Sequence, residues 1–305
     1  MSSSPFSSLA VPASGVSVMK TWIDAISDNV ANSNTVHRTS EKAFQTEYVV
    51  AKSVPSSMGA GGIGKTRLAL AAGKAARASF PDGVWFVPLA AISDPTLVPS
   101  AIITALGIRE AGASTGIGRI TEFLRDKQTL LLLDNFEQVV NAATMVAELL
   151  TGCPRLTMLV TSRMRLRVSG EREFAVAPLS LVSSGDYTQT GTGHSSDAAR
   201  LFVARASATD HQFALTPHNA DTIDDICARL DGLPLAIELA APWLKVLSPG
   251  ELLLRLDRRL PLLTGGHRDL PARQHTMRAT IAWSHTLLSP AEQVLFRRLT
   301  IFAGG

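Results

Sequence analysis

Residues 59–66 carry the clearest chemistry in the chain. Their sequence, GAGGIGKT, fits the phosphate-loop pattern of a glycine, any four residues, a glycine, a lysine and a serine or threonine. Glycines let backbone N–H groups curl around phosphate oxygens, while Lys65 and Thr66 would reach the β/γ-phosphates and Mg²⁺. The glycines of this expected cradle are Gly59, Gly61, Gly62 and Gly64. The motif predicts a site for ATP or ADP with Mg²⁺.

A helix is expected directly after this loop, over residues 67–77. The positive end of its dipole would point at the bound anion, as helix N-termini commonly do at phosphate sites. Arg67 begins this helix, and we therefore count it with the expected nucleotide-binding residues.

An acidic residue further along the chain supports the phosphate loop. Residues 129–134, TLLLLD, form an apolar run that is typical of a buried parallel strand. Asp134 would stand at the carboxyl end of that strand, where open α/β sheets bind ligands, and would join Thr66 in holding Mg²⁺. Taken alone, the same run is an ordinary core strand that enters a turn.

The residue after Asp134 is Asn135, so a second acid that would activate water is absent at that position. Glu137 is the nearest candidate for this general base. The pattern favours a slow nucleotide switch over a fast hydrolase.

Two further strand-like runs complete the pattern, at residues 83–89 (GVWFVPL) and 156–163 (LTMLVTSR). The second delivers Arg163 at its carboxyl end. An arginine there is able to sense a γ-phosphate, or it is a solvated loop arginine beside Arg165 and Arg167. These runs together predict an α/β fold built on a parallel sheet.

Composition bounds the remaining possibilities. The 305 residues are 46% hydrophobic and carry a formal net charge of +3, which suits two packed domains and gives no bulk charge for nucleic acid. Two cysteines suit a reducing compartment, and no apolar stretch is long enough to span a bilayer. We expect a cytoplasmic protein without signal peptide, membrane span or direct nucleic-acid binding. The arginines at 255, 258, 259, 268, 273 and 278 are interpreted as solvated helix faces.

The order of four motifs resembles one family. The runs are GGIGKTRLAL at 61–70, LDNFEQV at 133–139, TSR at 161–163 and GLPLAIELA at 232–240. Over about residues 59–305 the chain resembles STAND-class (NB-ARC-like) NTPases, and more narrowly the ATPase core of LuxR/AfsR-type bacterial regulators. The resemblance implies an ATP/ADP switch with slow ATPase activity.

The same resemblance implies an architecture and one more site residue. A P-loop NTPase sheet would be followed by a helical domain and by the start of a winged helix, to which the tail from 288 is similar. In this family the proline of the GLPL motif contacts the nucleotide, which gives Pro234 that role; otherwise Pro234 simply begins a helix. The remaining winged helix, helical repeats and DNA-binding domain of the family are not expected within these 305 residues.

The N-terminal segment looks different. Apolar residues recur at heptad spacing and predict an amphipathic helix, which would ordinarily pack on its own domain; they are Val16, Met19, Ile23, Ile26 and Val30. However, residues 5–54, and 23–35 above all, resemble flagellar basal-body rod proteins. In that family this helix pairs with a C-terminal helix, which we do not find here.

Two alternatives follow from this segment. It could self-associate or bind flagellar rod proteins through residues 13–52, at the flagellar basal body, or the chain could be a degenerate fusion with neither activity. The residues before the phosphate loop, KSVPSSM at 52–58, lack the apolar strand that should anchor it. The apolar run at 49–51 could substitute for this strand, but it lies several residues too far from the phosphate loop. We therefore expect a fusion junction within 52–66, and the first strand of the sheet is in doubt.

The expected division of the chain has five parts. They are a rod-like segment at 1–54, a P-loop nucleotide-binding domain at 55–181, a linker at 182–195, a helical domain at 196–265 and the start of a winged helix at 266–305.

Overall fold

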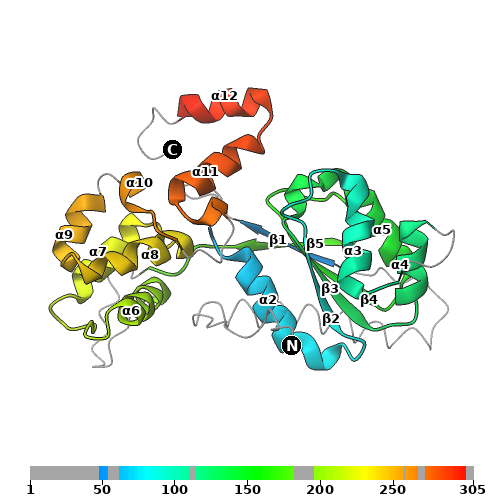
Figure 1. Ribbon diagram of the computed structural model, residues 1–305, viewed down its shortest axis with the longest axis horizontal. Helices are drawn as coiled ribbons and strands as arrows, with labels where there is room; N and C mark the ends of the chain where they lie inside the picture. The colour runs from blue at the N-terminus through cyan, green and yellow to red at the C-terminus, as the bar shows by residue number, and fades with distance from the viewer. Residues whose placement is uncertain are drawn as a thin grey trace. The chain divides into compact units, whose positions relative to one another are not determined.

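The computed structural model describes residues 48–53, 62–109, 115–181, 196–256, 259–266 and 272–299 (Figure 1). The chain forms two compact units. Among the described residues, unit 1 holds residues 48–53 and Lys65–Val176, and unit 2 holds residues 62–64 and those from Ala177 onward. The expected heptad helix lies outside the described residues. The five-part division of the chain stays a prediction.

Unit 1 is built on a five-stranded sheet whose order is β2-β3-β4-β1-β5, with every pair parallel. The strands are β1 Tyr48–Ser53, β2 Val84–Pro88, β3 Thr129–Asp134, β4 Leu156–Thr161 and β5 Glu171–Val176. All of the residues of β3 and β4 are buried, as expected for parallel strands that helices cover on both faces. The predicted parallel α/β sheet is confirmed.

The first strand of the sheet, which the sequence left in doubt, is present. β1 lies inside the sheet, where Val50 is level with Val160 of β4 and with Glu173 of β5. The run at 49–51, set aside for its spacing, is the middle of this strand. The spacing argument failed because it required the strand to end directly at the first glycine, whereas β1 ends at Ser53 and Gly59 follows later in the chain.

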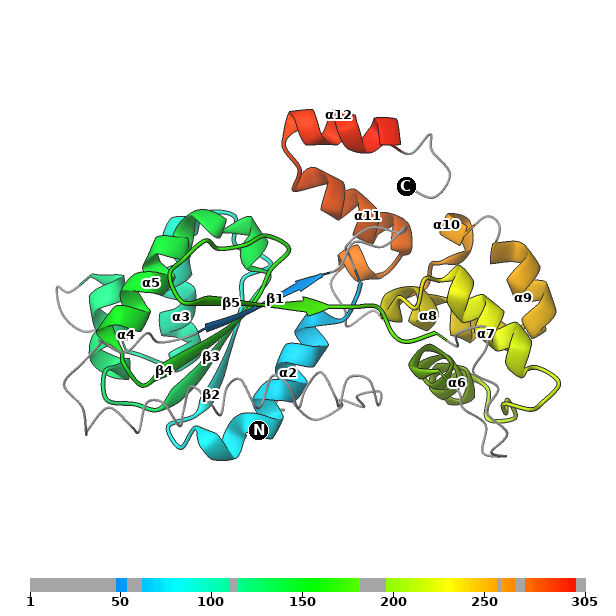
Figure 2. The same cartoon turned by 180° about the vertical axis from the view of Figure 1, so that it is seen from behind.

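Helices cover both faces of this sheet (Figures 1 and 2). They are α2 Lys65–Ala75, α3 Val98–Leu106, α4 Gly116–Leu124 and α5 Ala143–Gly152. The last three pack against alternate residues of β3 and β4, such as Leu131 and Val160, in one aliphatic core. On the other face α2 approaches closely, because a methyl group added to Gly73 would come 3.0 Å from Leu132 Cδ1.

Unit 2 contains the remaining described helices. They are α6 Asp197–Thr209, α7 Ala220–Arg229, α8 Pro234–Ala240, α9 Pro249–Arg255, α10 Arg259–Leu262, α11 Met277–Thr286 and α12 Pro290–Leu299. Short 3₁₀ helices complete the two units at Ala76–Ser79, Pro95–Leu97, Phe136–Gln138, Val140–Ala142, Ala241–Lys245 and Ala272–Gln274. Within the described ranges no helix has the length and apolarity that crossing a membrane requires.

Candidate functional site

Residues 62–64, the part of the glycine-rich loop that the structure describes, have a backbone conformation that favours glycine. Gly62 and Gly64 have φ angles of +82° and +96°, in the region that L side chains rarely adopt. Lys65 follows as the first residue of α2, so the loop runs directly into the N-terminus of that helix. Gly59 and Gly61 lie outside the described residues.

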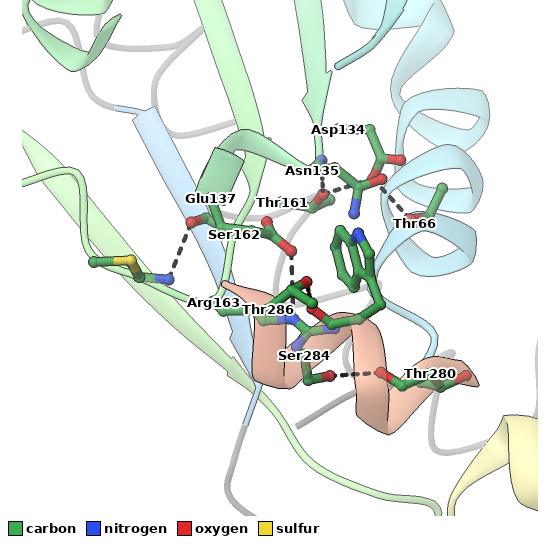
Figure 3. Close-up of polar contacts among 12 residues, drawn as sticks. Thr66, Asp134, Asn135, Glu137, Thr161, Ser162, Arg163, Thr280, Ser284 and Thr286 are labelled. Atoms are coloured by element: carbon green, nitrogen blue, oxygen red, sulfur yellow. Dashed lines mark hydrogen bonds and ion pairs between the residues drawn. The ribbon is translucent and has the colours of Figure 1, made fainter. Parts of the chain in front are cut away.

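Thr66 and Asp134 meet although 68 positions separate them. The Thr66 hydroxyl donates a hydrogen bond of 2.7 Å to Asp134 Oδ1, at the point where α2 begins and β3 ends (Figure 3). The same carboxylate oxygen accepts a second bond, of 2.6 Å, from the Thr161 hydroxyl at the end of β4. Three adjacent elements therefore converge on one carboxylate.

Thr161 also shapes the turn after β3. Its hydroxyl accepts a hydrogen bond of 3.0 Å from the backbone N–H of Asn135. Asn135 is in the left-handed conformation, with φ +64°, which asparagine tolerates better than most residues. Thr161 thus acts as a donor to Asp134 and as an acceptor for Asn135, and it fixes both. Thr161 belongs to the TSR run at 161–163 but was given no role from sequence; its place at the end of a predicted strand was the available signal.

Lys65 is a partly buried lysine whose pKa is shifted. Burial lowers the pKa of Lys65 from 10.5 to about 8, since desolvation disfavours the ammonium form. The carboxylates of Glu137 and Asp134 act in the opposite direction, and Arg163 adds to the lowering. An anion bound beside the Lys65 amine would favour its charged form and raise its pKa again.

Glu137 and Arg163 form an ion pair, with Arg163 Nε 3.4 Å from Glu137 Oε1 (Figure 3). Their side chains are only 3% and 17% exposed. Arg165, by comparison, is 61% exposed and pairs with Glu173. The description of a solvated loop arginine therefore fits Arg165 and does not fit Arg163.

The segment that carries Arg163 is held by short-range hydrogen bonds. Ser162 is fully buried, and its hydroxyl accepts the backbone N–H of Met164 at 3.1 Å. The Glu171 carboxylate accepts the N–H groups of Leu166 and Arg167, at 3.0 and 2.7 Å. The β4–β5 connection is thereby ordered at both of its ends.

In unit 2, the turn between α7 and α8 contacts the glycine-rich loop. The backbone N–H of Leu235 donates to the carbonyl of Gly62 at 3.2 Å, and a methyl group built on Gly62 would come 2.7 Å from Leu235 Cβ. A methyl group built on Gly64 would lie 3.8 Å from Pro234 Cγ. Pro234 is thus adjacent to the loop, and Leu235 is a contact that the sequence analysis missed.

That turn is itself held by the segment that follows β5. Gly232 has φ +61°, and its carbonyl accepts the N–H of Leu179 at 2.9 Å. A methyl group on Gly232 would come 2.4 Å from the Leu179 carbonyl oxygen. Only glycine fits there, which explains the glycine of the GLPL motif.

The predicted site residues therefore form two described groups. Lys65, Thr66, Asp134, Glu137 and Arg163 come together in unit 1, and Gly62, Gly64 and Pro234 come together in unit 2. Arg67 lies in the first turn of α2 and is partly buried. The chemistry of the first group suits a phosphate with a hard cation, because it offers two cations for the anion and a hydroxyl and a carboxylate for Mg²⁺.

The fold is that of the P-loop ATPases. The ORC2 protein of Aeropyrum pernix, solved in ADPNP-ADP complexes, aligns with a TM-score of 0.50 at 13% identity, over 83% of this chain and 70% of that one. At this identity the likeness shows the fold alone.

Relatives by sequence include bacterial regulators. A putative HTH-type transcriptional regulator of Mycobacterium tuberculosis is 40% identical over 248 residues, which is 81% of this chain and 26% of that protein. The regulatory protein AfsR of Streptomyces griseus is 29% identical over 266 residues, 82% of this chain and 24% of that protein. The chain thus spans about a quarter of these relatives. No protein-family model matches it.

These findings bear out the regulator part of the expected resemblance and the P-loop ATPase fold. They lend no support to the flagellar rod resemblance or to the LuxR-type label. Most of the rod-like segment lies outside the described residues, and its last part forms β1 of the sheet.

Proposed function

We propose that this chain is the nucleotide-binding core of a bacterial regulator, which binds ADP or ATP with Mg²⁺ and hydrolyses ATP slowly. The observation that carries the proposal is the hydrogen bond between Thr66 and Asp134. It places the hydroxyl that follows the loop lysine against the acidic residue at the end of β3. This is the arrangement in which P-loop proteins hold a nucleoside triphosphate and its metal. The regulatory role is supported by the similarity to the mycobacterial and streptomycete regulators.

Each residue has a part in the proposed site. The glycine-rich loop would wrap the phosphates, Lys65 would neutralise the β- and γ-oxygens, and Thr66 with Asp134 would hold Mg²⁺. When bound there, Mg²⁺ would supply positive charge that neutralises the phosphates. Pro234, beside the loop in unit 2, would contact the nucleotide.

The proposed hydrolysis is slow for two reasons. Asn135 follows Asp134, so the position directly after the metal-binding acid holds no base. The other carboxylate, Glu137, is paired with Arg163 and is therefore a poorer base for water. A protein with these properties stays in one nucleotide state long enough to act as a switch.

The test is a titration of the whole chain with fluorescently labelled ADP and Mg²⁺. Lys65→Ala should weaken binding by roughly a hundredfold, because the loop loses a partly buried cation that faces the phosphates. Lys74→Ala is the matched control, since Lys74 is an exposed lysine on the same helix, and it should bind as the unmodified protein does. Equal affinity of the Lys65→Ala and Lys74→Ala proteins, or no binding by the unmodified chain, would overturn the proposal.

A further inference from the structure

Glu137 is a buried carboxylate whose hydrogen-bonding capacity is not filled. Its side chain is 3% exposed, and Oε1 forms the ion pair with Arg163. Oε2 is buried and has no hydrogen-bond partner among the described residues. Burying a carboxylate in this way is costly, and a half-satisfied buried charge commonly marks a functional position.

The two carboxylates near the loop have different neighbours. Asp134 is turned toward hydroxyl groups, those of Thr66 and Thr161, while Glu137 is turned toward Arg163 (Figure 3). Glu137 also exerts the largest opposing charge effect on the pKa of Lys65, ahead of Asp134. Both cations that would meet a terminal phosphate are therefore already compensated by one carboxylate.

We propose that Glu137 takes the place of the γ-phosphate in the absence of a nucleoside triphosphate, and sets the preference of the site for diphosphate over triphosphate. It holds Arg163 when no γ-phosphate is present and releases it when one arrives. Glu137 is thus a specificity-determining residue that acts through Arg163. The proposal rests on the nucleotide-binding function proposed above.

The energetic reason is an exchange of partners. In this proposal a diphosphate, which has no γ-phosphate to meet Arg163, would leave the ion pair intact. A triphosphate must break that pair and must also lie near an uncompensated carboxylate, which repels it. Removing the negative charge of Glu137 should therefore favour triphosphate binding over diphosphate binding.

The experiment compares ADP with a non-hydrolysable ATP analogue, AMP-PNP, each with Mg²⁺, by titration calorimetry. Glu137→Gln keeps the shape of the side chain and removes its charge, and the ratio Kd(ADP)/Kd(AMP-PNP) should rise about tenfold. Glu173→Gln is the matched control, because Glu173 also pairs with an arginine of the β4–β5 connection but is more exposed. Its ratio should equal that of the unmodified protein.

The role of Arg163 is tested by repeating the substitution in an Arg163→Gln background. There, Glu137→Gln should raise the ratio by no more than about threefold, since Arg163 is no longer present to be released. Should Glu137→Gln fail to fold, Glu137→Asp keeps the charge but withdraws it by one methylene, and should raise the ratio about threefold.

Three results would overturn the proposal. They are an unchanged ratio in the folded Glu137 variant, an equal rise in the control, and an undiminished rise in the Arg163→Gln background. If the unmodified chain bound neither nucleotide, the proposed function would fail with it. Normal ADP binding with an unchanged ratio would refute the role of Glu137 alone.

Discussion

The two units hold their candidate site residues by different means. In unit 1, Asp134 is fixed by two threonine hydroxyls and Arg163 by a buried carboxylate, so side-chain charge and hydrogen bonding set the geometry. In unit 2, the turn before Pro234 is fixed by backbone hydrogen bonds and by a glycine that admits no side chain. The first arrangement is sensitive to charge and the second to shape. Substitutions can test each without altering the other.

The largest effect on stability is expected at Gly232 of unit 2, where the space available to the side chain decides the outcome. Gly232→Ala should destabilise unit 2 by about 3 kcal/mol or more, because it adds a methyl group 2.4 Å from the Leu179 carbonyl oxygen at a residue with φ +61°. Urea unfolding followed by circular dichroism measures this loss.

Gly265→Ala is its matched control. Gly265 also has a positive φ, of +83°, but a methyl group there would meet nothing within 4 Å. It should cost only the strain of the left-handed backbone, about 1 kcal/mol. Equal losses for the two variants would mean that the contact between Leu179 and Gly232 does not hold the turn.

The next effect concerns the hydroxyl groups of unit 1. Thr161→Val should destabilise the chain by about 1–3 kcal/mol, because Asp134 loses a donor and the Asn135 N–H loses its acceptor inside the fold. Thr129→Val is the matched control, since Thr129 is equally buried on the neighbouring strand and its hydroxyl has no partner among the described residues.

For Thr129→Val the free energy of unfolding should stay the same or increase, because a buried hydroxyl that has no partner among the described residues is replaced by a methyl group. Both variants are compared by urea unfolding, and Thr161→Val should in addition weaken ADP binding. A loss of stability as large in Thr129→Val would show that the hydrogen bonds of Thr161 are not the cause.

Local sequence pattern was sufficient for the strands and the loop that make up most of the site. The apolar run at 129–134 and the motif at 59–66 needed no tertiary information, because a buried strand and a phosphate loop each have a characteristic composition. β5 escaped prediction, since its first three residues are charged, only its last three are apolar, and it forms the edge of the sheet. β1 stayed in doubt because its spacing from the phosphate loop was given more weight than its β-branched residues.

The pairing within the site could not be predicted from sequence. Glu137 and Arg163 were both candidates, but whether they meet depends on the turn after β3 and on the β4–β5 connection. Likewise, the Leu235–Gly62 contact depends on the turn through Gly232 that joins α7 to α8. Motifs identified the residue types, and tertiary structure decided which of them act on one another.

The smallest effect concerns the charge of Lys65 in unit 1 and the pH dependence of ADP binding. Because the pKa of Lys65 in the free protein is about 8, the lysine is mostly charged at pH 7 and mostly neutral at pH 9. A bound phosphate favours the ammonium form and raises this pKa, so binding above pH 8 requires the uptake of a proton. ADP affinity should therefore be nearly constant below pH 7 and should fall as pH rises, by roughly tenfold from pH 7 to pH 9.

Titration calorimetry at several pH values, in buffers of different ionisation enthalpy, measures both the affinity and the proton uptake. Lys65→Arg is the matched variant, because a guanidinium does not deprotonate in this range, and its weaker binding should change little between pH 7 and 9. If the two proteins lost affinity in parallel, the titrating group would be elsewhere, and the partly buried charge of Lys65 would not govern the pH dependence. A fall confined to the lysine protein would instead show that desolvation at the start of α2 prepares this amine for an anion.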